Sequence, residues 1–99
     1  MPYRIEYSPE TEAHLRTLSA RDHSTVLDAV DQQLCHEPTR ETRNRKPMRP
    51  NPLAPWELRI GNLRVYYEVE EAPERLVLIR AVGIKERERI WIGGEEVTL

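Results

Sequence analysis

The chain has 99 residues, of which 38% are hydrophobic and 32% charged, a size and balance typical of one soluble domain spanning residues 1–99. No run of 18 apolar residues is present and the first residues lack an apolar signal segment, so we expect neither a transmembrane helix nor secretion. The net charge of −2 does not by itself favour nucleic-acid binding, and the single cysteine, Cys35, fits a reducing cytoplasm.

The N-terminal third predicts one strand followed by two helices. Apolar and polar residues alternate over residues 3–7, which indicates a short strand. Ser8 then suits a helix N-cap and Pro9 the first helical position. A break over residues 19–22 precedes a second helix, from about residue 22 or 23 to residue 36, whose apolar stripe indicates one buried face.

The middle segment, residues 38–55, predicts an extended loop. It holds five of the eight prolines and shows no sustained hydrophobic period. Because only about 45 residues follow it, too few for most independent domains, we do not interpret it as a domain linker.

The C-terminal part predicts a hairpin and a further strand. Residues 56–60 and 63–69 form the hairpin around a Gly61-Asn62 turn, and residues 75–82 form a third, central strand that ends at Gly83. The last residues form a short final strand or a tail. The predicted fold is α+β with the order β-α-α-β-β-β, a curved antiparallel sheet with two N-terminal helices packed on one face.

Alternation gives the hairpin two different faces. One is apolar and should pack under the helices; the other carries Glu57, Arg59, Arg64, Tyr66 and Glu68 and should be uncovered. A two-residue turn sets Arg59 directly opposite Arg64, where like charges repel. Glu57 could partly neutralise them as an ordinary surface cluster, or the face could await phosphate groups, which arginine binds bidentately.

Charge is concentrated around this hairpin. Between Arg40 and Arg64 there are seven basic and two acidic residues, a net of +5, whereas the rest of the chain carries −7. A local basic segment can bind a polyanion in an acidic protein, although a solvated basic loop explains the same charges.

Two motifs, in this order, resemble the RelE/ParE superfamily of toxins from type II toxin–antitoxin systems. They are Arg64-Val65-Tyr66-Tyr67 on a strand and the segment from Val82 to Arg87. The resemblance covers nearly the whole chain in the order of its elements and is most specific from Trp56 to Trp91.

The RelE branch of that family implies a toxin that cuts messenger RNA on the ribosome, without a metal or other cofactor, leaving a 2′,3′-cyclic phosphate. Basic residues stabilise the charge on the phosphorane and an aromatic residue stacks on a base. Carried over by position, the resemblance assigns catalytic roles to Arg64, Arg59, Lys85 and Glu57, and RNA binding to Lys46, Arg49, Tyr66, Arg87 and Trp91.

Two positions depart from the RelE pattern. Glu57 stands where RelE has a lysine, so it is either a base, as glutamate is in some relatives, or a salt-bridge partner. Trp91 stands where RelE has a tyrosine, and its ring can stack on a base but has no hydroxyl to move a proton. The alternatives are a ParE-type inhibitor of DNA gyrase and an inactive homologue that only binds its antitoxin.

The resemblance also implies an acidic antitoxin partner, in a hetero-oligomer. An antitoxin helix or strand would lie along the helices and across the basic groove, covering Arg64. Other groups of residues give little indication of a functional site. His14, His23 and His36 lack the spacing of metal ligands, and Cys35 has no base placed to activate it as a nucleophile.

Overall fold

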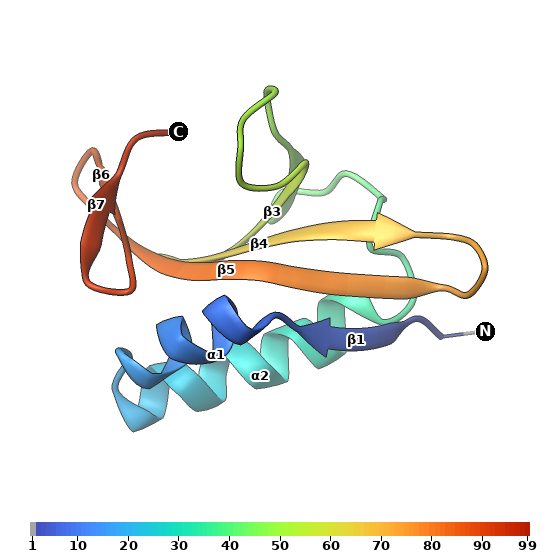
Figure 1. The fold of residues 1–99 in the computed structure, drawn as a ribbon, viewed down its shortest axis with the longest axis horizontal. Coiled ribbons are helices and arrows are strands. Elements are labelled where there is room, and N and C mark those ends of the chain that lie inside the picture. Colours follow the sequence, from blue (N-terminus) through green and yellow to red (C-terminus); the bar gives the residue numbers. More distant parts are fainter. Residues whose placement is uncertain (1) are drawn as a thin grey trace.

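The computed structural model describes residues 2–99 and arranges two helices beneath one face of a curved sheet (Figure 1). The elements, in chain order, are β1 (Arg4–Tyr7), α1 (Pro9–Arg16), α2 (Ala20–Leu34), β2 (Arg45–Pro47), β3 (Trp56–Ile60), β4 (Leu63–Glu70), β5 (Leu76–Glu86), β6 (Arg89–Ile92) and β7 (Glu95–Val97). Strands β2 to β7 are neighbours in that order and all pair antiparallel, while β1 pairs parallel with the first half of β5. The α+β class, the two helices on one face and the central place of the third predicted strand are confirmed.

Both helices begin at a serine that caps them. Ser8 Oγ accepts a hydrogen bond from the Thr11 backbone N–H at 3.1 Å, and Ser19 Oγ accepts one from the Asp22 N–H at 3.1 Å. Each serine satisfies a backbone donor that the first turn leaves free. The Ser8 cap is as predicted, but the second helix starts two residues earlier than expected because Ser19 is its cap and not part of a longer break.

The main core lies between the helices and the sheet. It is made by one stripe of the helices (Leu15, Val26, Val30, Leu34) and by alternate residues of the strands (Leu58, Leu63, Val65, Tyr67, Val77, Ile79, Val82). The apolar face of the hairpin therefore packs where the sequence placed it, and its burial away from water is the main force holding the helices on the sheet.

No helix in the part of the chain that the structure describes is both long and apolar enough to cross a membrane.

Two further predicted boundaries are wrong. Residues 45–47, expected within a loop, form β2 and pair with β3. Gly83 was expected to end the central strand, yet β5 continues through it to Glu86 and pairs there with β6. A Cβ at Gly83 would lie 2.5 Å from the Trp91 carbonyl oxygen, so the glycine permits close approach of β6 instead of ending β5.

Strand β5 contains one irregularity in its pairing with β4. Tyr66 pairs with Ala81 and Tyr67 with Ile79, so Arg80 has no partner across the ladder. Such a bulge interrupts the alternation of side chains between the two faces of the sheet.

Side chains of α1 fill a gap on the other edge of β5. Strand β1 pairs with β5 as far as Ile79 and β6 pairs from Gly83 onward. Between them, Thr11 Oγ1 donates a hydrogen bond to the Ile79 carbonyl at 2.8 Å, and His14 Nδ1 accepts one from the Val82 N–H at 3.4 Å. The helix thus gives the Ile79 carbonyl a second donor, besides the Ser8 N–H, and satisfies the Val82 N–H, which no strand reaches on this edge.

The packing of His14 against β5 makes the stability of the fold depend on pH. Burial lowers the pKa of His14, and the nearby Glu10 carboxylate offsets that only in part. The folded protein therefore binds the His14 proton less tightly than the unfolded chain, whose histidines titrate at about 6.5. Stability is full above that pH and is lost as the pH falls through the folded-state pKa. We expect the free energy of unfolding, measured by urea denaturation, to fall more in the wild type than in His14→Gln between about pH 7.5 and about pH 5. Equal slopes would show that His14 has the same pKa in both states.

Candidate functional site

The sheet face opposite the helices carries a second, smaller core. Tyr66, Ala81 and Ile92 are buried there together with Ala54 from the loop between β2 and β3. The prediction that this face is uncovered is therefore wrong around Tyr66. The loop and the β6–β7 hairpin rise from this face (Figure 1) and close over the tyrosine ring, which is fully buried.

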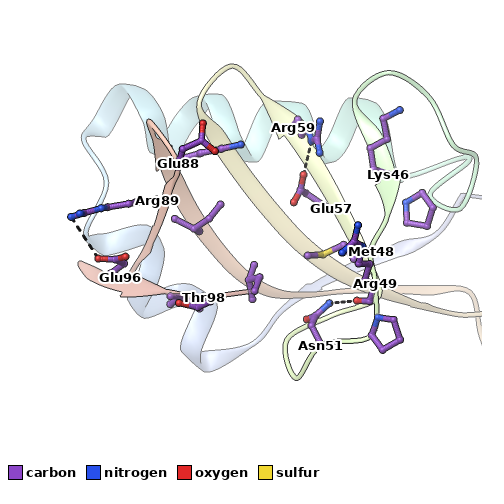
Figure 2. Close-up of a pocket in the computed structure, with 16 residues that line it drawn as sticks. Lys46, Met48, Arg49, Asn51, Glu57, Arg59, Glu88, Arg89, Glu96 and Thr98 are labelled. Atoms are coloured by element: carbon purple, nitrogen blue, oxygen red, sulfur yellow. Dashed lines mark hydrogen bonds and ion pairs between the residues drawn. The ribbon is translucent and has the colours of Figure 1, made fainter.

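An open cavity of about 640 Å³ lies between that loop and the β6–β7 hairpin. Figure 2 shows Glu57 and Arg59 on β3, with Met48 and Arg49 on one side and Glu88 and Arg89 on the other. Five of the predicted site residues line this cavity: Lys46, Arg49, Glu57, Arg59 and Lys85.

The strand register explains why these charges meet. Lys46 pairs with Glu57 across β2 and β3, and Arg59 pairs with Arg64 across β3 and β4, as the two-residue turn predicted. Directly opposed residues share a face of the sheet, so these side chains all lie on the side away from the helices. Lys85 reaches the same side from β5.

Glu57 offsets the repulsion between the two opposed arginines. Its Oε1 accepts a hydrogen bond from Arg59 Nε at 2.5 Å and lies 3.8 Å from Arg64 Nε. Glu57 is 9% exposed, so this pairing is shielded from water more than a surface salt bridge is. Arg64 also donates to the carbonyl oxygens of Gly61 and Leu63, at 2.8 and 2.9 Å.

Four predicted site residues do not line the cavity. Arg64 is held beside Glu57 and its side chain is mostly buried. Arg87 is exposed in the β5–β6 turn with a φ of +57°. Trp91 pairs with Ile84, which packs against the helix-side core, so its ring lies on the opposite face of the sheet. Tyr66 is buried and presents no free ring face to a base.

Sequence reasoning missed the apolar part of the cavity. Its lining includes Met48, Ile90 and Val97, which pack against the small core around Tyr66. The Met48 loop is ordered by Asn51, whose Oδ1 accepts hydrogen bonds from the backbone N–H groups of Leu53 and Ala54. Such an Asx turn is a recognisable loop signal, but it does not say which strand the loop will cover.

The Tyr66 hydroxyl has no hydrogen-bond partner within residues 2–99, although its oxygen is buried. Burial and the neighbouring Glu57 carboxylate raise the pKa of Tyr66, while Arg64 and Arg59 oppose the shift. The side chain is therefore neutral at ordinary pH and its hydroxyl is desolvated without compensation.

Tyr66→Phe should stabilise the fold for this reason. Removing an unpaired buried hydroxyl removes its desolvation cost, so we expect the free energy of unfolding to rise by about 1 kcal/mol. Urea denaturation of the two proteins measures this directly. Tyr67→Phe is the matched control and should be destabilising, because Tyr67 Oη donates a 2.6 Å hydrogen bond to the Pro38 carbonyl. A loss of stability in Tyr66→Phe would mean that its hydroxyl has a partner.

Within residues 2–99, no three His, Cys, Asp or Glu side chains are grouped so that they could hold a metal ion.

The comparisons with known proteins concern the fold. A solved structure, the toxin–antitoxin complex RelBE2 from Mycobacterium tuberculosis, contains a chain that superimposes with a TM-score of 0.73. The alignment covers 86% of this chain and 100% of that chain, at 24% sequence identity. No protein-family model matches the sequence, and no curated protein matches it. The protein has a RelE-type fold, as the resemblance implied.

Proposed function

We propose that this protein is the toxin of a type II toxin–antitoxin system and a RelE-like endoribonuclease that cuts messenger RNA on the ribosome. The observation that supports this most is the cavity on the sheet face away from the helices, which is lined by the Glu57 carboxylate and by Arg59, Lys85, Lys46 and Arg49. The likeness in fold to a chain of the RelBE2 complex adds to it.

The cavity has groups suited to each part of the cleavage step. The ribose 2′-oxygen attacks the adjacent phosphorus while its proton passes to the Glu57 carboxylate. The bond from phosphorus to the 5′-oxygen breaks, leaving a 2′,3′-cyclic phosphate and a 5′-hydroxyl that takes its proton from water. Arg59 and Lys85 stabilise the negative charge that builds on the phosphorane oxygens.

Substrate binding would also release Glu57 from Arg59, so that its carboxylate can act as the general base. In the unbound protein Arg59 donates to Glu57 Oε1, which occupies the carboxylate. The contact with Glu57 uses only one nitrogen and one oxygen, Arg59 Nε and Glu57 Oε1, whereas a phosphate can bind the guanidinium through two oxygens. Transfer of Arg59 to the phosphate leaves Glu57 able to accept a proton.

An acidic antitoxin segment would inhibit the toxin by occupying the same cavity. The segment from Arg40 to Arg64, with its net charge of +5, supplies four of the eight charged residues that line the cavity. An antitoxin bound along the helices and across the cavity would also cover Arg64. Charge complementarity of this kind favours fast and selective association.

Induction of the protein in growing cells tests the proposal. We expect growth arrest, and primer extension on ribosome-bound message should reveal cuts at defined codon positions. Intact message together with linearised plasmid DNA would instead indicate gyrase poisoning. Absence of arrest, with capture of a co-expressed antitoxin encoded by the neighbouring gene, would indicate an inactive homologue. Either result would refute the nuclease proposal.

Glu57→Gln separates a base from a salt-bridge partner. Glutamine cannot take the proton, so we expect the cleavage rate to fall by about 100-fold. The rate of cleavage of ribosome-bound message measures this. Glu68→Gln is the control. Glu68 lies on β4, is half-buried and is on the same face of the sheet as Glu57, but it pairs with Arg80 and does not line the cavity. If both variants cleave at the wild-type rate, Glu57 only neutralises the arginines.

A further inference from the structure

The cavity has an apolar side as well as a charged one. Met48, Ile90 and Val97, which together we call the apolar shelf, are half-buried, pack on the small core around Tyr66 and line the cavity with the charged residues. One side of these side chains contacts the small core, and the other side faces the cavity.

Strand pairing sets the shelf beside a cation. Lys85 pairs with Ile90, and Ile90 pairs with Val97, so the three side chains follow one another in a row across β5, β6 and β7. Directly opposed side chains on one face are close neighbours. A ligand bound to Lys85 therefore has an apolar surface within one side chain's reach.

No aromatic side chain lines the cavity among the described residues. Tyr66 is buried beneath the loop, and Trp91 lies on the other face of the sheet. A flat ring entering the cavity would thus contact aliphatic and thioether groups. Methionine suits this role because its unbranched, polarisable side chain adapts to the shape that contacts it.

We infer that the apolar shelf binds the base of a single-stranded nucleotide whose phosphate is held by Arg59 and Lys85. The cavity combines adjacent cationic and apolar surfaces, which match the anionic and the flat apolar parts of a nucleotide. Its volume of about 640 Å³ lies in the usual range for small-molecule sites. This inference rests on the proposed function and adds which part of the ligand each side of the cavity takes.

A pair of uncleavable oligonucleotides tests the shelf. One is a short 2′-O-methyl oligoadenylate; the other has the same length and phosphates but abasic sugars throughout. Burying a base on the shelf should make the wild type bind the oligoadenylate about 10-fold more tightly, as measured by competition in fluorescence anisotropy. Met48→Gln and Ile90→Thr should each reduce this ratio toward one while leaving the affinity for the abasic strand unchanged.

Two charged variants provide the matched comparison. Lys85→Gln should weaken binding of both oligonucleotides equally, because it removes a phosphate contact. Arg21→Gln, an exposed residue on α2, should change neither. Near-wild-type amide spectra for Met48→Gln, whose side chain lies on a loop, exclude misfolding as the cause of a lost ratio.

Four results would overturn the inference. An unchanged ratio in a Met48→Gln, Ile90→Thr double variant would show that the base does not contact the shelf. Binding of a glutamate-rich peptide with the same dependence on Met48 and Ile90 would assign the shelf to a protein partner. If the wild type binds both strands equally well, the base-binding role of the apolar shelf is refuted but the proposed function is not. If it binds neither strand, both the role of the shelf and the proposed nucleic-acid function are refuted.

Discussion

A double variant, Arg59→Gln with Lys85→Gln, is expected to lose growth arrest and to cut ribosome-bound message at least about 100-fold more slowly than the wild type. Both side chains line the cavity and both would face the phosphorane. Removing a positioned donor to a developing negative charge costs far more in the transition state than in the ground state. The cleavage rate at saturating ribosomes measures the effect.

The control removes the same two charges elsewhere. Arg21→Gln with Arg80→Gln changes the net charge equally, but both residues are exposed and lie outside the cavity. We expect this variant to arrest growth as the wild type does. If the Arg59, Lys85 variant is folded and still arrests growth, the cavity is not the site of toxicity.

Gly83→Ala is expected to have the largest effect on stability, a loss of about 3 kcal/mol. The added Cβ would lie 2.5 Å from the Trp91 carbonyl oxygen and 2.8 Å from Ile92 Cγ1. The first of these is a backbone atom held in the β5–β6 ladder, so β6 must move away. Because β6 forms one wall of the cavity, binding should be lost together with stability. Urea denaturation measures the first effect and oligonucleotide titration the second.

Gly61→Ala is the matched glycine control. No atom lies within 4 Å of a Cβ at Gly61, but its φ of +58° disfavours a side chain, so we expect a loss of only about 1 kcal/mol. Equal losses in the two variants would show that β6 can shift without cost. That result would also weaken the role of β6 as a fixed wall.

The local features of the hairpin could be predicted because they depend on neighbouring residues. The two-residue turn fixes Arg59 opposite Arg64, and alternation fixes which side chains share their face. The capped start of α1 and the apolar stripe of α2 follow for the same reason. Patterns of period two and 3.6 contain this information without any knowledge of the fold.

The burial of Tyr66 could not be predicted in the same way. Alternation correctly places the residue on the face away from the helices, but its cover comes from Ala54, 12 residues earlier, and Ile92, 26 residues later. Short edge strands such as β2 and β7 add little hydrophobic period to the sequence. The apolar half of the cavity is built from these segments, so it appears only once the strands are paired.

Gly83 shows that one residue type can have two meanings. A glycine after an apolar run is commonly the end of a strand, and the sequence pattern predicts such an end at Gly83. It is also the residue that lets two backbones approach closely, which is its role here. Only the position of β6 distinguishes the two.

The bulge at Arg80 shifts the alternation of side chains in β5 by one residue. Before it, Val77 and Ile79 face the helices; after it, Val82 and Ile84 do, so odd and even positions exchange sides. If Arg80 were paired within the ladder instead, strict alternation would place the side chain of Lys85 on the helix side, whereas deletion of Arg80 would leave Lys85 on the cavity side. The side of the sheet on which Lys85 lies therefore depends on the one residue that the bulge leaves out of the ladder, and not on the types of the residues in β5.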